Sequence, residues 1–380
     1  MKKKLFLLDA YALIYRAHFA FIKNPRINSN GLNTSAIFGF CNSLLEVINN
    51  HQPTHLAVVF DPPGGSQREE VFLDYKANRQ EMPEEIRKSI PYIFDILKAM
   101  NIPFKMEDGF EADDLIGTLA KQAEKKDYQV YMMTPDKDFG QLVSENIFIY
   151  KPGRGGNPSE ILGPKEVCEK FEVERPEQVI DILGLWGDAV DNIPGIPGIG
   201  EKTAKKLIGI YGSIENLLAN TADLKGKQKE NVENFAEQGL ISKQLATIIL
   251  DSPVTFDELE FERKEIDEKE ITKILKELEF NQLGKRILGK PIYQEKQMDL
   301  FAGNEIESIS EPTFHTISSI KPKYQLIEKK EDHINLIKKL LFQEAVAFDT
   351  ETTSLDINEA KLLGISFCFS KNEAYYCDVS

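Results

Sequence analysis

Three short apolar runs, each followed by aspartate, constrain the fold of this chain most strongly. They read "KKLFLLD", "THLAVVFD" and "YQVYMMTPDKD". None alternates apolar with polar residues as a half-exposed strand does, and helical patterning separates each run from the next. Continuous apolar strands that alternate with helices are typical of a parallel sheet covered on both faces. We therefore predict an α/β fold with a mostly parallel central sheet and flanking helices.

The aspartates at the ends of these runs are predicted to share one edge of the sheet. Asp9 ends the first run, Asp61 the second, and Asp136 with Asp138 the third. In open α/β sheets the ligand crevice lies beyond the carboxyl ends of the strands. One aspartate after a strand is an ordinary turn residue, whereas acids at three strand ends indicate a site.

A further acidic run, "DGFEADDLIGTLAKQ", places Glu111, Asp113 and Asp114 ahead of an apolar helical pattern. Two like charges about 4 Å apart repel by roughly 4 kcal/mol at an effective dielectric constant of about 20. Water, a basic partner or a divalent cation would offset this repulsion. If Gly109 ends a loop, Glu111 lies at the helix cap and the other two acids lie in the first turn. The alternative is plain helix-start chemistry, because acids favour the N-terminal turn of a helix.

The stretch "LGLWGDAVDNIPGIPGIGEKTAKKLIGIYGS" predicts two apolar helices joined by a glycine-rich hairpin, a helix–hairpin–helix. Its glycines let backbone N–H groups approach a phosphate, and the start of the second helix favours an anion. The alternative is a connector without a ligand. The residues singled out for binding the DNA backbone are Gly195, Gly198, Gly200, Lys202, Lys205 and Lys206, and a further acidic pair is Asp188 and Asp191.

A charged segment between the second strand and the acidic run is predicted to be helical, with interruptions at Pro83 and Pro91. Such a run is usually a solvated face of a helix. Its position beside the acidic edge favours contacts to phosphate instead. The candidate side chains are Arg68, Tyr75, Lys76, Arg79 and Arg87.

The last part of the chain is predicted to hold a linker and a second domain. Residues 290–320 lack periodicity and are typical of an exposed linker. Runs such as "AVAFDTETTSLD" and "LLGISFCFS" predict a domain over 321–380 that opens with strands. Within it, Asp349 and Glu351 alternate at a strand end, which again resembles a metal-binding pair.

Composition limits the class of protein. The formal net charge of −15 argues against indiscriminate coating of nucleic acid, although it allows a local basic groove. The four cysteines have no C-x-x-C spacing, so a reducing compartment is expected and a zinc site is not. Asp9 interrupts the apolar start too early for a signal peptide, and no run is long enough for a membrane helix. We expect a cytoplasmic protein that makes no membrane contact.

Six ordered motifs resemble a known family. "FLLDAYALIYRAHFA", "VVFD", "YKANR", "FEADDLIGTLA", "TPDKDFGQLV" and "GDAVDNIPGIPGIGEKTA" are similar to the 5′-nuclease domain of the bacterial DNA polymerase I family, which belongs to the flap-endonuclease family. "FDTETTSLD" resembles the first acidic motif of the 3′–5′ exonuclease domain in the same family.

The resemblance implies a division of the chain into parts. A PIN or flap-endonuclease-like core over 1–175 contains a helical arch at about 62–103, and a helical subdomain with the helix–hairpin–helix spans 176–289. After the linker, 321–380 would be a truncated RNase H-like 3′–5′ exonuclease domain. We expect neither polymerase nor 3′–5′ exonuclease activity from these 380 residues, because the later acidic motifs of that domain are absent.

The resemblance also implies cofactors and residue roles. Two divalent ions, Mg²⁺ or Mn²⁺, would be held by acids that match Asp9, Asp61, Glu111, Asp113, Asp114, Asp136, Asp138, Asp188 and Asp191. Lys76 and Arg79 on the arch would steer the 5′ strand and neutralise phosphate charge. Arg16 and Arg68 are weaker candidates for DNA contacts, and Tyr75 is a candidate for stacking on a displaced base. In the family the hairpin often surrounds a K⁺ ion, so such an ion is implied here. Pro135 departs from the glycine usual in the family just before Asp136, so the local turn is expected to shift slightly.

The implied function is a metal-dependent 5′ nuclease that removes flaps or RNA primers in bacterial replication and repair, as a monomer near the nucleoid. The linker peptide "QMDLF", with Gln297, Leu300 and Phe301, resembles a short motif that binds the sliding clamp. The alternative for that peptide is packing of Leu300 and Phe301 on a neighbouring domain. The alternative function is a non-catalytic binder of DNA junctions. A nucleotide-binding protein is disfavoured, because no glycine-rich phosphate loop follows any predicted strand.

Overall fold

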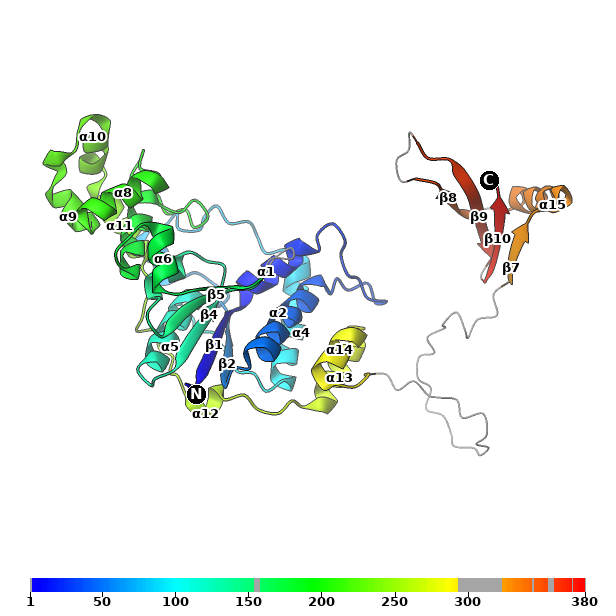
Figure 1. The fold of residues 1–380 in the computed structure, drawn as a ribbon, viewed down its shortest axis with the longest axis horizontal. Coiled ribbons are helices and arrows are strands. Elements are labelled where there is room, and N and C mark those ends of the chain that lie inside the picture. Colours follow the sequence, from blue (N-terminus) through cyan, green and yellow to red (C-terminus); the bar gives the residue numbers. More distant parts are fainter. Residues whose placement is uncertain are drawn as a thin grey trace. The chain divides into compact units, whose positions relative to one another are not determined.

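The computed structural model describes residues 2–153, 158–292, 323–343, 345–354, 359–370 and 372–379. The chain folds as two compact units, Met1–Lys296 and Gln297–Ser380. Figure 1 shows the sheet of the first unit enclosed by helices and a smaller sheet with one helix in the second.

The first unit is built on a sheet of six strands in the order β3-β2-β1-β4-β5-β6. All neighbouring strands are parallel except β6, which pairs with β5 in the antiparallel sense. The three apolar runs form β1, β2 and β4, so the predicted parallel core of the sheet is confirmed. The strands are β1 Lys4–Asp9, β2 His55–Val59, β3 Phe104–Lys105, β4 Gln129–Met133, β5 Ile147–Lys151 and β6 Glu160–Leu162.

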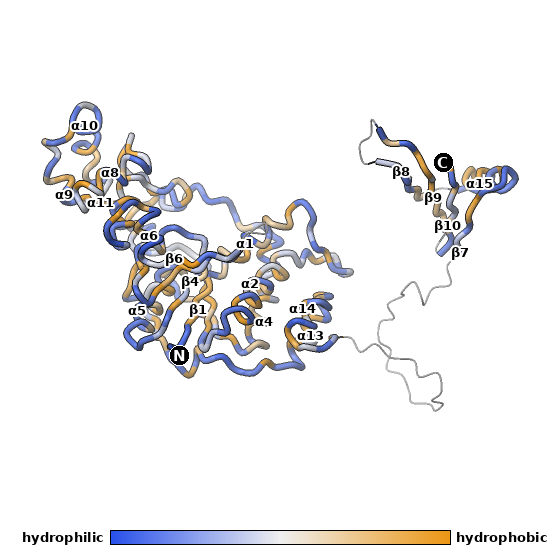
Figure 2. Tube along the Cα trace, in the orientation of Figure 1, coloured by the Kyte–Doolittle hydropathy of each residue, from blue (hydrophilic) through white to orange (hydrophobic). Residues whose placement is uncertain are grey.

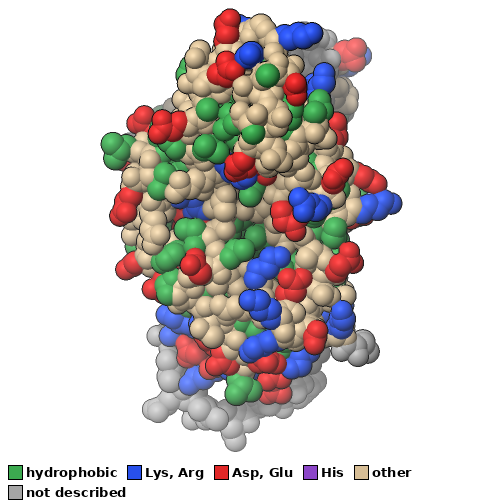
Figure 3. Space-filling model, turned by 90° about the vertical axis from the view of Figure 1, so that its left-hand side faces the viewer, with side chains coloured by type: hydrophobic (Ala, Val, Ile, Leu, Met, Phe, Trp, Pro, Cys, Tyr) green, Lys and Arg blue, Asp and Glu red, His purple; other side chains and the backbone are tan. Residues whose placement is uncertain are grey.

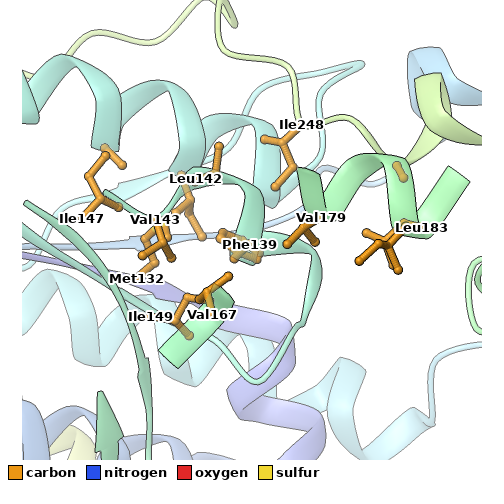
Figure 4. Close-up of a cluster of buried hydrophobic side chains, with 14 of the residues drawn as sticks. Met132, Phe139, Leu142, Val143, Ile147, Ile149, Val167, Val179, Leu183 and Ile248 are labelled. Atoms are coloured by element: carbon orange, nitrogen blue, oxygen red, sulfur yellow. The ribbon is translucent and has the colours of Figure 1, made fainter. Parts of the chain in front are cut away.

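Side chains of the central strands alternate between two hydrophobic cores. Leu5 and Leu7 of β1 lie in one core, while Phe6 and Leu8 lie in the other, and all four are fully buried. Figure 2 accordingly shows the central strands as apolar along their length. Figure 4 shows part of the first core, where Met132 and Phe139 lie among apolar side chains. Burial of both faces is the physical reason why these runs are continuously apolar.

The helices contribute to the two hydrophobic cores, some of them over the sheet and others in the helical subdomain beyond it (Figure 1). On the face of Phe6 the core includes residues of α1 Ala10–Ala20, α2 Ser35–His51, α4 Glu84–Ala99, α13 Glu268–Glu277 and α14 Asn281–Leu288. On the face of Leu5 it includes residues of α5 Ala112–Glu124, η1 Asp138–Leu142, α6 Pro164–Phe171, α7 Val179–Trp186, α8 Glu201–Tyr211, α9 Ile214–Ala219, α10 Gly226–Asn234, α11 Ala236–Ala246 and α12 Glu258–Phe261. Short elements complete the unit: α3 Gln67–Val71, η2 Pro176–Gln178 and η3 Thr221–Asp223.

The charged segment predicted to be helical is helical only in part. The short helix α3 is followed by consecutive turns over 73–78, and α4 begins after its N-cap Pro83. Pro91 lies inside α4 and does not end it, contrary to the expectation of an interruption there.

The helix–hairpin–helix is present, with α7 and α8 joined by residues 187–200. Two of its glycines lie backbone to backbone. A Cβ atom on Gly195 would lie 2.5 Å from the amide nitrogen of Gly187, and both residues have positive φ, +60° and +78°. Because the obstacle is main chain, no side-chain movement can relieve it.

The second unit contains a four-stranded sheet in the order β7-β10-β9-β8. Its elements are β7 Lys323–Ile327, α15 Lys330–Leu341, β8 Ala347–Thr352, β9 Leu362–Ser370 and β10 Glu373–Asp378. The predicted strands of this part of the chain are therefore confirmed. Across the described ranges, no helix combines the length and the apolar character needed to cross a bilayer.

Replacing Gly195 with alanine is expected to destabilise the first unit by roughly 2–4 kcal/mol, because the new Cβ overlaps main chain at a positive φ. A Cβ atom on Gly200 would meet no other atom within 4 Å, so Gly200→Ala serves as the matched control. Its cost should stay within about 1 kcal/mol. Urea unfolding monitored by circular dichroism measures both, and equal midpoints would contradict the packing argument.

Candidate active site

The structure brings the strand-end acids to one edge of the sheet. Asp9 is the last residue of β1, Asp61 follows β2 by two residues, and Asp136 follows β4 by three. Burial, the charge of Asp61 and the charge of Asp136 raise the pKa of Asp9 to about 7. The N–H of Ala112 donates to Asp61 at 2.9 Å, which joins the start of α5 to the end of β2.

Asp138 keeps a buried oxygen without a hydrogen bond. Its N–H donates to Asp136 at 2.9 Å, so the two carboxylates lie close together at the start of η1. Burial and the neighbouring charge of Asp136 raise the pKa of Asp138 well above its ordinary value. Its Oδ1 has no hydrogen-bond partner within the described part of the chain, and the Lys137 ammonium lies 3.9 Å from it. Such an oxygen is costly to bury unless a cation contacts it closely.

Lys137 is a residue of this site that the sequence reasoning missed. Its ammonium forms an ion pair with Asp188 and lies 5.2 Å from the centroid of the Trp186 ring. The signal was its position between two aspartates in "PDKD". Lys137 thereby links the sheet edge to the first residues of the hairpin.

The start of α5 has the predicted geometry, with Glu111 at the N-cap and Asp113 and Asp114 in the first turn. Burial opposes the charge of Glu111, but Lys76 and Arg68 outweigh this effect and lower the pKa of its carboxyl group. Burial and the nearby charges of Asp114 and Glu111 raise the pKa of Asp113 well above its ordinary value, although Arg68 opposes them.

Asp114 and Arg68 form a buried ion pair, which corrects both of their predicted roles. The Arg68 guanidinium donates to the two Asp114 oxygens at 2.9 and 2.8 Å. The same oxygens accept the N–H groups of Ile249 and Glu111, so the carboxylate is saturated and is a poor ion ligand here. Arg68 is only 5% exposed and also donates to the Leu245 carbonyl, so it does not face DNA.

Tyr75 also departs from its predicted role. Its side chain is 4% exposed and belongs to the core on the Leu5 face, and its hydroxyl donates to Glu111 at 3.2 Å. The prediction of base stacking is wrong for this conformation, because the ring is buried.

Lys76 and Arg79, which were predicted to contact the 5′ strand, form ion pairs with two of the acids. The Lys76 ammonium lies 2.5 Å from Glu111, and the Arg79 guanidinium lies 2.6 Å from Asp191. Half of the Arg79 side chain is exposed, so it is also accessible to a ligand.

The carboxylates thus fall into two groups. The acids paired with lysine or arginine are Glu111, Asp113, Asp114, Asp188 and Asp191, together with Asp138 at the longer distance of 3.9 Å from Lys137. Asp9, Asp61 and Asp136 make no ion pair with any residue that the structure describes. Among those residues no three metal-ligating side chains lie close enough to hold an ion in this conformation. The oxygen donors and the Asp138 oxygen without a hydrogen bond nevertheless fit a hard divalent cation.

The hairpin residues predicted to bind DNA also fall into two groups, those whose polar groups already have protein partners and those that are exposed. The N–H of Gly195 donates to Ser242 and its carbonyl accepts from Gln238, so this glycine serves packing and its prediction as a phosphate contact is corrected. Lys205 pairs with Glu201 at 2.8 Å and is 11% exposed, so it too is largely occupied. Lys202 and Lys206 are exposed on α8, and Gly198 and Gly200 are exposed in the hairpin before it.

On the face of the molecule drawn in Figure 3, neither sign of charge forms one continuous patch. Among the side chains coloured in Figure 3, acidic and basic groups are interspersed over the face shown. Arg16 donates to the carbonyl of Gly153, which accounts for part of its binding capacity. DNA contacts are therefore expected at particular cations.

Two other predicted sites belong to the second unit, Gln297–Ser380. Asp349 and Glu351 are exposed on β8 of the second unit, on the same side of the strand. Gln297, Leu300 and Phe301 lie outside the described residues.

An α/β sheet with acids at its carboxyl edge, next to a helix–hairpin–helix, defines the class of 5′ nucleases. The comparisons agree with this class. Residues 4–172 match the model for "5′-3′ exonuclease, N-terminal resolvase-like domain", residues 174–269 that for "5′-3′ exonuclease, C-terminal SAM fold", and residues 324–380 that for "3′-5′ exonuclease". The 5′-3′ exonuclease of Aquifex aeolicus is 37% identical over 299 residues, which cover 79% of this chain and 100% of that protein. The chain belongs to the 5′-3′ exonuclease family.

DNA polymerase I of Bacillus subtilis is 36% identical over 334 residues, which cover 87% of this chain and 37% of that protein. The chain thus spans little more than a third of that relative. Among solved structures, T5 5′-exonuclease with bound zinc superposes with a TM-score of 0.56 at 19% identity, covering 76% of this chain and 99% of that chain. This likeness supports the fold.

Replacing Arg68 with alanine should cost roughly 3–5 kcal/mol of stability, because Asp114 would remain buried without its partner. The double variant Arg68→Met with Asp114→Leu should lose clearly less than the sum of the two single variants. Urea unfolding of Arg68→Met, Asp114→Leu and the double variant, each compared with wild type, measures the coupling. Strictly additive losses would contradict a saturated buried pair.

Replacing Asp138 with asparagine should raise the stability of the ion-free protein by roughly 1 kcal/mol, because it removes one of several mutually repelling charges. The same change should reduce the rise in Tm on adding Mg²⁺ or Mn²⁺, since ion binding stabilises only a competent folded state. Asp223 is exposed, so Asp223→Asn should leave both measurements unchanged. Equal cation-induced shifts in wild type and Asp138→Asn, measured by scanning calorimetry, would count against an ion site here.

Proposed function

We propose that the first unit is a structure-selective 5′ nuclease that hydrolyses phosphodiester bonds at 5′ flaps, nicks and RNA primers. The observation that carries this proposal is the acidic edge itself. Acids from three strand ends and one helix start lie together. Two cations reach them from residues 72–79, the stretch of turns after α3 that we call the 72–79 turn. Such a site can hold a phosphodiester between fixed positive and negative groups.

We further propose that the acids hold two divalent ions, Mg²⁺ or Mn²⁺. Asp9, Asp61, Asp136 and Asp138 are the first candidates, because burial raises the pKa of each carboxyl group and a bound cation would relieve that cost. Glu111, Asp113, Asp188 and Asp191 would complete the ligand set. When bound, such ions supply the charge that activates a water molecule and stabilises in-line displacement at phosphorus.

The cations of the chain have a second role in this proposal. Lys76 and Arg79 bind Glu111 and Asp191 when no phosphate is present. A scissile phosphate placed at the same edge competes for these ammonium and guanidinium groups. Lys76 and Arg79 would then orient the phosphate and neutralise its charge, while Arg68 remains with Asp114 and keeps α5 in place.

The helical subdomain is proposed to hold the duplex next to the cleaved strand. Gly198, Gly200, Lys202 and Lys206 are exposed at or near the start of α8, so their N–H and ammonium groups are proposed to contact the backbone phosphates. Helix N-termini favour phosphate. A K⁺ ion at this hairpin is part of the proposal, since backbone carbonyls near the glycines are suitable ligands.

The wider setting is also a proposal. The DNA polymerase I relatives suggest that this region acts beside a polymerase in bacterial replication and repair, in the cytoplasm at the nucleoid. We propose that it works as a monomer and that residues 297–301 contact the sliding clamp. The second unit would serve as part of a 3′–5′ exonuclease domain, with Asp349 and Glu351 as ligands of its metal.

A 5′-labelled flap, a nicked duplex and a single strand, each incubated with Mg²⁺, test this function by product sizing. We expect the flap to be cut, and Asp136→Asn to lower the rate by roughly 10³-fold, because the site loses an ion ligand. Asp136 is a better choice than Asp114, whose replacement would disturb the buried pair. The exposed Asp223→Asn is the control.

Tight binding of the flap without any cleavage, at every divalent ion tried, would favour the alternative of a non-catalytic junction binder. Cleavage that survives in Asp136→Asn would overturn the assignment of the acidic edge.

A further inference from the structure

The turn that carries Lys76 and Arg79 is fastened to the hairpin loop that carries Asp188 and Asp191. The Asn78 side-chain amide donates to the carbonyl of Ala189 at 2.7 Å. The Asn192 side-chain amide donates in the opposite direction, to the carbonyl of Asp74 at 2.6 Å. We name this reciprocal pair the asparagine clamp.

A main-chain hydrogen bond lies between the two halves of the clamp. The N–H of Lys76 donates to the carbonyl of Asp191 at 2.9 Å. Lys76 and Asn192 both adopt left-handed backbone conformations, with φ of 58° and 56°. Residues other than glycine adopt this region rarely, and they keep it where surrounding contacts hold them there.

The clamp matters because it lies on the exposed side of the turn, beyond Tyr75, whose ring is buried in the core. Asn78 and Arg79 are exposed, and the turn lies between the short helix α3 and the start of α4. Lysine and arginine side chains lose much rotamer freedom when they are held in one place. Anchoring their backbone beforehand removes part of that cost and sets the distance between each cation and its carboxylate.

We propose that Asn78 and Asn192 are positioning residues for the 5′-3′ exonuclease reaction. They join the 72–79 turn to the 188–192 loop, and so hold Lys76 and Arg79 in register with the acidic edge. Neither asparagine needs to touch substrate. The inference rests on the roles of Lys76 and Arg79 in the proposed function, and it assigns the residues that make those roles possible.

Two variants test the clamp, each with little other disturbance. Asn78→Ala removes one amide donor from an exposed turn. Asn192→Gly removes the other, while glycine retains the positive φ without strain. Asn101 offers a matched control, because it also has a positive φ of 52° and its side-chain amide donates to the Glu265 carbonyl at 2.6 Å. Asn101→Gly therefore reports the general cost of losing such a bond.

Hydrogen exchange at the Lys76 amide is the first measurement, and it does not depend on activity. We expect this amide to exchange about tenfold faster in Asn78→Ala and Asn192→Gly than in wild type or Asn101→Gly, because the hydrogen bond to Asp191 opens more often. Unchanged protection in both clamp variants would overturn the proposal, whatever the cleavage assay gives.

Steady-state cleavage of the 5′-labelled flap with Mg²⁺ is the second measurement. We expect kcat to fall about 3- to 10-fold in each clamp variant, the usual worth of one hydrogen bond, with KM nearly unchanged. Arg79→Ala should then cost distinctly less in the Asn192→Gly background than in wild type, because Arg79 is already misplaced there.

The outcomes separate this proposal from the one on which it rests. If wild type cleaves flaps but the clamp variants cleave as well as Asn101→Gly does, the positioning role fails and the nuclease assignment stands. A full, additive effect of Arg79→Ala in the Asn192→Gly background would also overturn positioning. If wild type does not cleave, the proposed function fails, and exchange at Lys76 still decides whether the clamp exists.

Discussion

Mutual repulsion among buried carboxylates is the constraint to which the rest of the first unit responds. The parallel strands β1, β2 and β4 end at the same edge, so their terminal acids come together by topology alone. Burial then weakens the screening that water would supply, and the pKa of Asp9 rises to about 7 as a result. Cations from three segments partly compensate this negative charge through ion pairs. They are Arg68, Lys76 with Arg79, and Lys137.

The acids differ in how completely they are paired, and this difference separates acids with a structural role from acids that can bind a ligand. Asp114 accepts four hydrogen bonds, so its role is structural. Asp138 retains a buried oxygen with no hydrogen-bond partner among the described residues, so this oxygen is suited to binding a cation. The site thus combines acids that lack a close cation with the cations Lys76 and Arg79, which can leave their acids. It is therefore suited to binding metal ions at the acids and a phosphate at the two cations.

The parts of this site that follow from local pattern could be predicted from the sequence. Asp9, Asp61 and Asp136 were found because apolar runs predict strands and parallel strands share a carboxyl edge. Glu111 was found because Gly109 and the helical pattern fix where α5 begins. These inferences need only periodicity and general rules of topology.

What depended on distant packing could not be predicted. Asp114 looks like one more acid in a run, and only the fold shows that the Arg68 guanidinium and the Ile249 N–H, both remote in sequence, help to saturate it. Tyr75 lies in a charged stretch, yet the core of the first unit buries it. A glycine in a hairpin can allow the main chain to approach either a phosphate or another stretch of main chain. Gly195 packs against other main chain.

The buried Arg68–Asp114 pair has a mechanical consequence. Arg68 belongs to α3, so the stem of the 62–103 segment is pinned to α5 by charge that cannot be solvated without loss of stability. A few residues further on, Tyr75 anchors the turn in the core, while Asn78 and Arg79 at its exposed end are held by one amide hydrogen bond and one ion pair. We therefore expect the exposed end to move most readily when a strand binds, and the α3 end to stay fixed.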